Sequence, residues 1–323
     1  MVTIIGSLNM DLVVTADRAP REGETVTGSG FSQFPGGKGA NQAVAAARSG
    51  ARTVLAGRVG DDAFGEALIR SLARDPLDTS SIEIMSGTPT GIASITVDGQ
   101  GHNRIVVIPG ANGSFKARDM EALRPLIAQS NVLLLQLEIP LKAVERAVEI
   151  ARQENVYCIV NPAPALAFPE TLYRQVDLLT PNESELGLLS GLPMSGASSW
   201  RAGAKALLKR GLPALIITLG EEGSLALDDK SDLHMPAYRV QMLDSTAAGD
   251  CFNGALAAEI DAMIGTGRKS SSRVFFTPAQ LAPAIDRATR AAAISVTRQG
   301  AQPSLPWREE VDLFDEWFEK HRL

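Results

Sequence analysis

Cysteine, histidine and aromatic residues are all scarce in this chain. Of its 323 residues, two are cysteine, three are histidine and 5% are aromatic. Cys158 and Cys251 lie far apart, without the spacing of a metal site or a CxxC motif, which argues against a disulfide-stapled secreted fold and favours a reducing compartment. His102, His234 and His321 are scattered along the chain, so the sequence offers no zinc-binding spacing.

An excess of basic charge and long hydrophobic runs are also missing. The formal net charge is −6, which disfavours nucleic acid or anionic lipid as a main partner. No stretch reaches the roughly 18 apolar residues that span a bilayer, and Met1–Ser7 lacks a basic segment followed by a long apolar run. We therefore expect a cytoplasmic protein that binds neither nucleic acid nor membrane.

Three common ligand-binding or catalytic motifs are absent. No GxGxxG follows the first apolar run, which weakens a dinucleotide-binding hypothesis, and no GxSxG elbow of an α/β-hydrolase occurs. A Walker A loop is excluded because Ser32 stands where its first glycine belongs and Gly39 follows Lys38 in place of serine or threonine.

The chain does contain a regular alternation of short apolar runs and longer segments with helical periodicity. Hydrophobic residues make up 45% of the sequence, and this alternation is typical of a parallel sheet covered by helices. The expected strands are 3–5, 53–56, 132–137, 156–160, 178–180 and 215–218. The expected helices are 40–49, 64–74, 141–155, 184–189, 201–209, 249–264, 278–296 and 306–321.

Two regions interrupt the alternation, because residues 11–34 and 89–108 have strand patterns without an intervening helix. We expect them to form a small β-rich lid inserted into a single domain that spans residues 1–323. The polar stretch Gly265–Ser272 is predicted to be a surface loop between two helices.

A glycine-rich turn opens an alanine-rich helix at Pro35–Gly50. Paired glycines allow a ligand to approach the backbone closely, and the small residues after them allow the helix to pack tightly. The pattern also fits a purely structural turn before a helix.

A second cluster, Asp244–Gly254, is a polar loop that runs into a helix. The backbone N–H groups of Ala247, Ala248 and Gly249 are predicted to point at a common spot at the positive end of that helix, which suits a phosphoryl group in transfer. Asp250 places a carboxylate beside that spot. The alternative is that Asp250 only caps the helix.

Two further motifs follow predicted strands. In Thr180–Glu185, Asn182 and Glu185 share one helical face, where they are suited to hold the water shell of Mg²⁺, although the same residue types also form a capping interaction. Thr218–Gly223 is a strand end followed by a turn, for which an ordinary hairpin turn is the alternative.

Together and in this order, these clusters resemble the ribokinase branch of the PfkB family of sugar kinases over nearly the whole chain. Residues 35–51 and 244–254 are similar to the two family signatures, and Asn182 to Glu185 match its Asn-x-x-Glu magnesium motif. The shorter segments that are similar to the ribokinase branch are Gly6–Asp11, Gln136–Glu138, Asn161–Pro164 and Gly300–Trp307.

The resemblance implies a Rossmann-like, three-layer α/β/α core with a small β-sheet lid, and an ATP-dependent sugar kinase that uses Mg²⁺ and is activated by K⁺. The sugar-binding positions would be Asn9, Asp11, Gly37, Lys38, Asn41, Glu138 and Asp250, with Asp250 also the general base and the N–H groups of Ala248 and Gly249 forming an anion hole. The ATP positions would be Asn182, Thr218 and Gly220, with Asn182 and Glu185 holding Mg²⁺ through water. The potassium positions would be Asp244, Thr246, Ser295, Arg298, Gly300 and Ser304.

This chain departs from the family pattern in two places. Ser245-Thr246-Ala247 stands where many members have Thr-x-Gly, and the stretch Gly265–Ser272 is longer than usual, on the side where the purine would bind. Neither change removes a predicted reacting group.

D-Ribose is the expected acceptor, giving ribose 5-phosphate. A kinase of the same fold for deoxyribose, another pentose, a sugar acid or a nucleoside is an alternative, and so is a catalytically silent sugar-binding regulator. Retention of Asp250, Asn182 and Glu185 argues against silence. The lid strands would leave unpaired edges in a monomer, and the resemblance likewise implies a homodimer joined through them.

Overall fold

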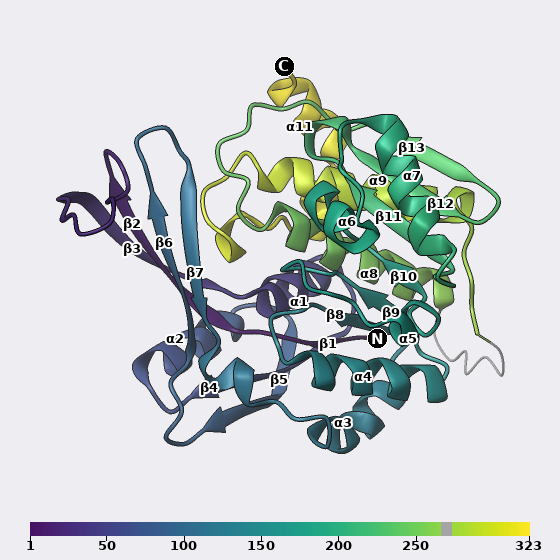
Figure 1. Ribbon diagram of the computed structural model, residues 1–323, viewed down its shortest axis with the longest axis horizontal. Helices are drawn as coiled ribbons and strands as arrows, with labels where there is room; N and C mark the ends of the chain where they lie inside the picture. The colour runs from purple at the N-terminus through teal and green to yellow at the C-terminus, as the bar shows by residue number, and fades with distance from the viewer. Residues whose placement is uncertain (266–272) are drawn as a thin grey trace.

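Two sheets, one of nine strands and one of four, organise residues 1–265 and 273–323, the part of the chain that this computed structural model describes (Figure 1). The order in the large sheet is β13-β12-β11-β10-β9-β8-β1-β4-β5. Its strands are β1 (Val2–Ile5), β4 (Thr53–Gly60), β5 (Leu77–Met85), β8 (Val132–Leu135), β9 (Tyr157–Val160), β10 (Leu178–Leu179), β11 (Ala214–Thr218), β12 (Ser224–Asp228) and β13 (Asp232–Met235). All neighbours from β11 to β5 are parallel, whereas β12 pairs antiparallel with both β11 and β13.

The central strands are apolar throughout because both faces of the sheet are covered. Ile4 belongs to one hydrophobic cluster and its neighbour Ile5 to the other, and Leu134 and Leu135 divide in the same way. This two-residue alternation between two cores is what a parallel sheet between two helix layers requires. The three-layer α/β/α core predicted from the sequence is therefore confirmed.

Two layers of helices cover the large sheet. The layer on the Ile4 side consists of α1 (Lys38–Arg48), α2 (Ala63–Leu72), α8 (Ala248–Ile264), α9 (Pro278–Ser295), α10 (Arg308–Asp312) and α11 (Phe314–His321). The layer on the Ile5 side consists of α3 (Asp119–Ala128), α4 (Leu141–Gln153), α5 (Glu170–Tyr173), α6 (Glu183–Ser190) and α7 (Ala197–Leu208). No helix in the described residues is both long and apolar enough to cross a bilayer.

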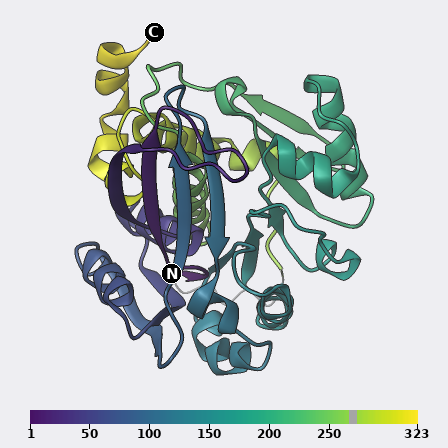
Figure 2. The same ribbon diagram turned by 60° about the vertical axis from the view of Figure 1, so that its left-hand side comes forward.

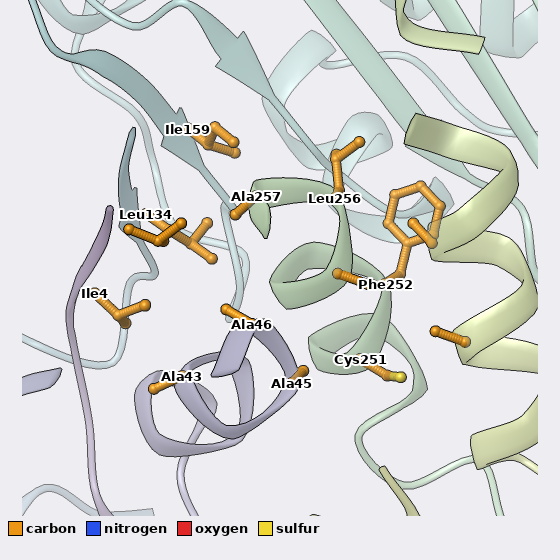
Figure 3. Packing of buried hydrophobic residues seen from close by; sticks show 14 of the residues in the cluster. Ile4, Ala43, Ala45, Ala46, Leu134, Ile159, Cys251, Phe252, Leu256 and Ala257 are labelled. Atoms are coloured by element: carbon orange, nitrogen blue, oxygen red, sulfur yellow. The ribbon is translucent and has the colours of Figure 1, made fainter. Parts of the chain in front are cut away.

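Helices α1 and α8 pack closely against each other on the sheet. Figure 3 shows Ala45 of α1 on the side that faces Cys251 of α8. The contact is tight at Gly254, where an added Cβ would lie 2.4 Å from the carbonyl oxygen of Gln42. Small residues on both helices thus bring the starts of α1 and α8 together.

The second sheet has the order β3-β2-β6-β7 and stands at one side of the large body, as Figure 2 shows. Its strands are β2 (Asn9–Ala16), β3 (Gly28–Gly36), β6 (Gly91–Val97) and β7 (Asn103–Ile108). They come from the two regions in which strands without helices were expected. Several of its apolar side chains are exposed, including Phe31 at 60%, Ile105 at 53% and Val106 at 64%.

Several elements were not expected from the sequence. β5, β12, β13, α3 and α5 are additional, and the single helix expected at 306–321 is divided into α10 and α11 at Leu313. β5 and β13 are partly exposed strands with many polar residues, and α3 contains Pro125, so their patterns were weaker than those of the central strands. The expected loop 265–272 lies outside the described residues except for Gly265.

Candidate active site

Asp250 is buried, with 6% of its surface exposed, and is held by two amides of α1. Its Oδ2 accepts a hydrogen bond from Asn41 Nδ2 at 2.9 Å, and its Oδ1 accepts one from Gln42 Nε2 at 3.0 Å. The N-cap of α8 is Ala247, which has a φ of 60°, and no side chain caps the helix there. The capping interpretation of Asp250 is therefore wrong.

Glu138 follows β8 and lies against the start of α1. Its Oε2 accepts hydrogen bonds from the hydroxyl of Ser7, from the backbone N–H of Lys38 at 3.1 Å and from Asn9 Nδ2 at 3.4 Å. Asn9 is itself fixed, because its Oδ1 accepts from Asn112 Nδ2 at 2.8 Å. Asn112 was not predicted as a site residue; the sequence around it only matches a glycosylation sequon.

The glycine-rich turn brings α1 against β2. Gly37 is the N-cap of α1 with a φ of 91°, and a Cβ there would lie 2.6 Å from the backbone nitrogen of Asn9. Only glycine satisfies both the left-handed backbone and the close approach. The structure brings together six polar side chains, called the polar cluster below: Asn9, Asp11, Lys38, Asn41, Glu138 and Asp250.

The charges of the polar cluster are strongly coupled. Burial raises the pKa of Asp11 from 3.8 to about 7, and the nearby carboxylates of Glu138 and Asp250 add to the rise. The pKa of Lys38 is raised, chiefly by the charge of Asp250. One ammonium group therefore balances several carboxylates, and the cluster offers many hydrogen-bonding groups of both kinds to a polyhydroxylated ligand.

A cavity of about 420 Å³, called the α8 cavity below, adjoins the start of α8. Ala248, Gly249, Thr218 and Gly220 line it, together with apolar side chains of Val240, Phe252, Ala292 and Val296. Among the described residues, the N–H groups of Gly249 and Asp250 have no acceptor, whereas Ala248 N–H donates to the Ser245 carbonyl at 3.2 Å. Free N–H groups at the positive end of a helix suit an anion.

The motif at Asn182 and Glu185 forms a capping box at the start of α6. Asn182 Oδ1 accepts from the N–H of Glu185, and Glu185 Oε2 accepts from the N–H of Asn182, both at 2.8 Å. The capping alternative is thus confirmed, yet it uses only one oxygen of Glu185. Burial raises the pKa of this carboxyl, which is also coupled to the charges of Lys38 and Asp250.

Thr218–Gly223 joins β11 to the antiparallel β12, so the hairpin-turn alternative is also confirmed. This turn nevertheless contributes two residues to the α8 cavity, Thr218 and Gly220. Asn182 lies beside them, because it forms a parallel bridge with Thr218.

Three of the six predicted potassium positions are joined by hydrogen bonds. Asp244 Oδ1 accepts from the N–H of Thr246 and Oδ2 from the N–H of Gly300, both at 2.9 Å. The guanidinium of Arg298 instead pairs with Glu310.

Ser295 and Ser304 are fully buried. Their hydroxyls donate to the carbonyls of Ala292 and Ala301 at 2.8 and 2.7 Å, and the Ser295 hydroxyl also interacts with the thiol of Cys251.

Residues 1–308 match the model of the pfkB family of carbohydrate kinases. The chain belongs to the PfkB family of carbohydrate kinases. It is 36% identical to a ribokinase of Haemophilus influenzae over 96% of each chain, and 33% identical to a deoxyribokinase of Salmonella typhimurium over 98% of each. The structure of Arabidopsis thaliana ribokinase complexed with ribose and ATP is similar at a TM-score of 0.84, with 27% identity and 97% of each chain covered.

A PfkB-family kinase is a phosphotransferase that acts on a sugar hydroxyl. Asp250 belongs to the polar cluster, and the two residues before it, Ala248 and Gly249, line the α8 cavity. Sequence reasoning missed three amides that organise this junction: Gln42, Asn112 and Asn161. Gln42 directly follows a predicted site residue, and Asn161 opens a motif similar to ribokinases, but neither pattern indicates which atom the amide would contact.

Proposed function

We propose that this PfkB-family kinase transfers the γ-phosphate of ATP to the primary hydroxyl of D-ribose, producing ribose 5-phosphate and ADP. The observation that carries the proposal is the position of Asp250. Its buried carboxylate lies in the polar cluster, and the two residues before it line the α8 cavity. The ribokinases among the relatives support ribose as the sugar.

The polar cluster would bind the sugar. A furanose has several hydroxyls and no charge, so carboxylates, amides and one lysine match its hydrogen-bonding groups. Asn9 and Glu138 are already fixed by other polar groups, which reduces the entropy lost on binding. Asp11, Gly37 and Asn41 complete the proposed sugar contacts.

In the proposed reaction, Asp250 accepts the proton of the primary hydroxyl while that oxygen forms a bond with the γ-phosphorus. The bond between the γ-phosphorus and the bridging oxygen of ADP breaks. The N–H groups of Gly249 and Asp250, which have no acceptor among the described residues, and the ammonium of Lys38 stabilise the charge on the transferred group. The N–H of Ala248, also expected to contribute, would first have to leave the Ser245 carbonyl. Positioning and charge neutralisation supply most of the acceleration in such a step.

The nucleotide would lie in the α8 cavity, with its sugar and phosphates along Asn182, Thr218 and Gly220. Mg²⁺ bound to ATP supplies further charge neutralisation on the phosphates. The described residues contain no group of three or more acidic, histidine or cysteine side chains suited to a metal, which fits an ion held mainly by phosphates and water. Glu185, with one uncommitted oxygen, and Asn182 would orient that water.

We also propose K⁺ as an activator beside the loop that precedes α8. Asp244 joins Thr246 to Gly300 there, and the hydroxyl of Ser304, which donates to the Ala301 carbonyl, is buried nearby in the chain. A cytoplasmic location is proposed as well, consistent with Cys158 and Cys251 being buried free thiols.

The proposed function is tested by measuring ADP formation with a panel of acceptors: D-ribose, 2-deoxy-D-ribose, other pentoses, a sugar acid and a nucleoside. We expect kcat/KM to be at least about tenfold higher for D-ribose, a difference of about 1.4 kcal/mol. A higher value for deoxyribose would reassign the enzyme to the activity of its Salmonella relative. If no acceptor stimulates ADP formation while ribose still binds, the chain is a silent sugar-binding protein.

A further inference from the structure

Each oxygen of the Asp250 carboxylate accepts a hydrogen bond from a side-chain amide, and only one of these two amides belongs to the proposed sugar site. Asn41, on Oδ2, is one of the proposed sugar contacts. Gln42, on Oδ1, is fully buried and directs its amide toward residues that follow β8 and β9. Two donors on opposite oxygens fix the plane of a carboxylate, which one donor alone does not.

The amide of Gln42 is oriented by two neighbours. Gln136 Nε2 donates to Gln42 Oε1 at 2.6 Å, and Gln42 Nε2 donates both to Asn161 Oδ1 and to Asp250 Oδ1, each at 3.0 Å. Asn161 is fixed in turn, because its Nδ2 donates to the carbonyl of Thr180 at 3.0 Å. Hydrogen-bond donation therefore runs from Gln136 through Gln42 in one direction, with one branch ending at the Asp250 carboxylate and the other passing through Asn161 to the Thr180 carbonyl.

This direction has a visible consequence at Gln136. Its Oε1 is buried and accepts no hydrogen bond among the described residues. If both glutamine amides were reversed, Oε1 of Gln136 would gain a donor, but the oxygen of Gln42 would then face the carboxylate of Asp250. The observed orientation leaves the Gln136 oxygen without a donor, but it places a donor of Gln42 against Asp250; the reversed orientation would do the opposite.

We propose that Gln42, with its amide oriented by Gln136 and Asn161, is the positioning residue that aligns the Asp250 carboxylate for proton acceptance. This role rests on the proposed function of Asp250 as general base. Gln42 touches neither substrate nor the reacting atoms and acts only through Asp250.

Gln42→Met tests the proposal, because methionine keeps the length of the side chain but cannot donate. We expect kcat to fall by about 10- to 100-fold, the effect of misaligning a reacting group by about 1 Å, while KM for ribose and ATP changes by less than about threefold. Gln136→Met leaves the Gln42–Asp250 contact but frees the amide of Gln42 to turn, so a smaller loss of about 3- to 10-fold is expected.

Asn131→Leu is the matched control, because Asn131, between α3 and β8, holds a carboxylate of the same helix α8 that carries Asp250. Asn131 Nδ2 donates to Asp261 Oδ1 at 2.7 Å, near the opposite end of α8. This variant also removes an amide that holds a carboxylate, but far from Asp250. We expect a lower melting temperature and a kcat within about twofold of the wild type.

A double-mutant cycle with Asp250→Asn separates positioning from general destabilisation. If Gln42 acts through Asp250, Gln42→Met costs nothing further once the carboxylate is gone. A Gln42→Met or Gln136→Met enzyme with kcat within about twofold of the wild type would overturn the proposal, as would additive losses in the cycle or an equal loss in Asn131→Leu. Where Gln42→Met does not fold, Gln136→Met decides by itself. An active Asp250→Asn enzyme would instead refute the proposed function.

Discussion

At the scale of single residues, Asp250 remains buried without an ion pair within 4 Å among the described residues. Neutral amides of Asn41 and Gln42 share its charge instead. Both of these partners are uncharged donors, and neither oxygen of the carboxylate is bound to a guanidinium or an ammonium within hydrogen-bond distance among the described residues.

Asp250→Asn is the direct test of the base. Asparagine keeps the shape but accepts from only one of the two α1 amides, so we expect a melting temperature lower by a few degrees, about the cost of one hydrogen bond. Sugar and ATP affinity should stay close to the wild type, while kcat falls by about 10²- to 10⁴-fold. A variant that retains more than about a tenth of wild-type kcat, a deficit below about 1.4 kcal/mol, would contradict the mechanism.

Asp11 predicts a specific pH dependence of stability. Its pKa in the folded protein is about 7 against an ordinary 3.8, so its contribution to stability is fully present below about pH 4 and is lost as the pH rises through about 7. Asp11→Asn removes this loss. The melting temperature of the variant minus that of the wild type should therefore be larger at pH 8 than at pH 5, and an equal difference at both pH values would argue against the shift.

The same substitution should weaken sugar binding. A charge-assisted hydrogen bond is worth roughly 1.5–3 kcal/mol, so the ribose KM of Asp11→Asn should rise by about tenfold or more with a smaller change in kcat. An unchanged KM would place Asp11 outside the sugar site.

At the scale of elements, the packing of α1 on α8 sets the geometry of the site. The amides of Asn41 and Gln42 reach Asp250 because Gly254, one turn later on α8, allows the helices to approach. An added Cβ at Gly254 would lie 2.4 Å from the Gln42 carbonyl oxygen and 2.5 Å from the Cβ of Ala45. Backbone atoms cannot give way there without separation of the helices.

Gly254→Ala should therefore affect stability and catalysis together. We expect a loss of about 1–3 kcal/mol in the free energy of unfolding, typical of overpacking, and a decrease in kcat of about tenfold or more. Gly187→Ala on α6 is the control, since its Cβ would meet atoms of Leu192 and Met194 no closer than 3.3 Å. Chemical denaturation and steady-state kinetics measure both effects, and wild-type values for Gly254→Ala would contradict this account of the interface.

The sequence predicted two kinds of element well: helices that bury one face, and strands that are buried on both faces. α4 was recognised because its apolar residues recur at helical spacing on one buried face, and β8 because it is apolar throughout. β13, in contrast, has no fully buried residue, so its pattern resembles that of a loop. The amide chain through Gln42 could not be predicted, since Gln136 and Asn161 are 94 and 119 positions away from Gln42.

At the scale of the whole molecule, the small sheet has exposed apolar side chains and two edge strands, β3 and β7. Such surfaces are usually covered in the functional state. We expect a homodimer joined through this sheet, and light scattering at micromolar concentration should report twice the chain mass.

An Ile105→Asp, Val106→Asp double variant should be monomeric, because adjacent strand residues point to opposite faces and both faces then carry charge. Leu188→Asp, at an equally exposed leucine of α6, is the control and should remain dimeric. A wild-type monomer, or a double variant that still forms dimers, would refute the interface.

The K⁺ proposal concerns a site that links the loop before α8 to the segment around Gly300. Exchange of K⁺ for Na⁺ at constant ionic strength should lower kcat, because a cation there would steady the N–H groups at the start of α8. Asp244→Asn should reduce the difference between the two salts. Equal wild-type rates in both salts would mean that the site is absent or unselective.

The hydrogen bond between Asn41 and Asp250 joins residues 209 positions apart in the chain. Closing so long a loop is entropically costly until the intervening strands have docked, and chains of this size commonly fold through intermediates. When the denatured enzyme is diluted from urea, the far-UV circular dichroism of its helices should therefore recover early, and kinase activity should return in a later phase. Activity thus serves as a stringent probe of complete folding, because the reaction centre is assembled by contacts between residues that are far apart in the chain.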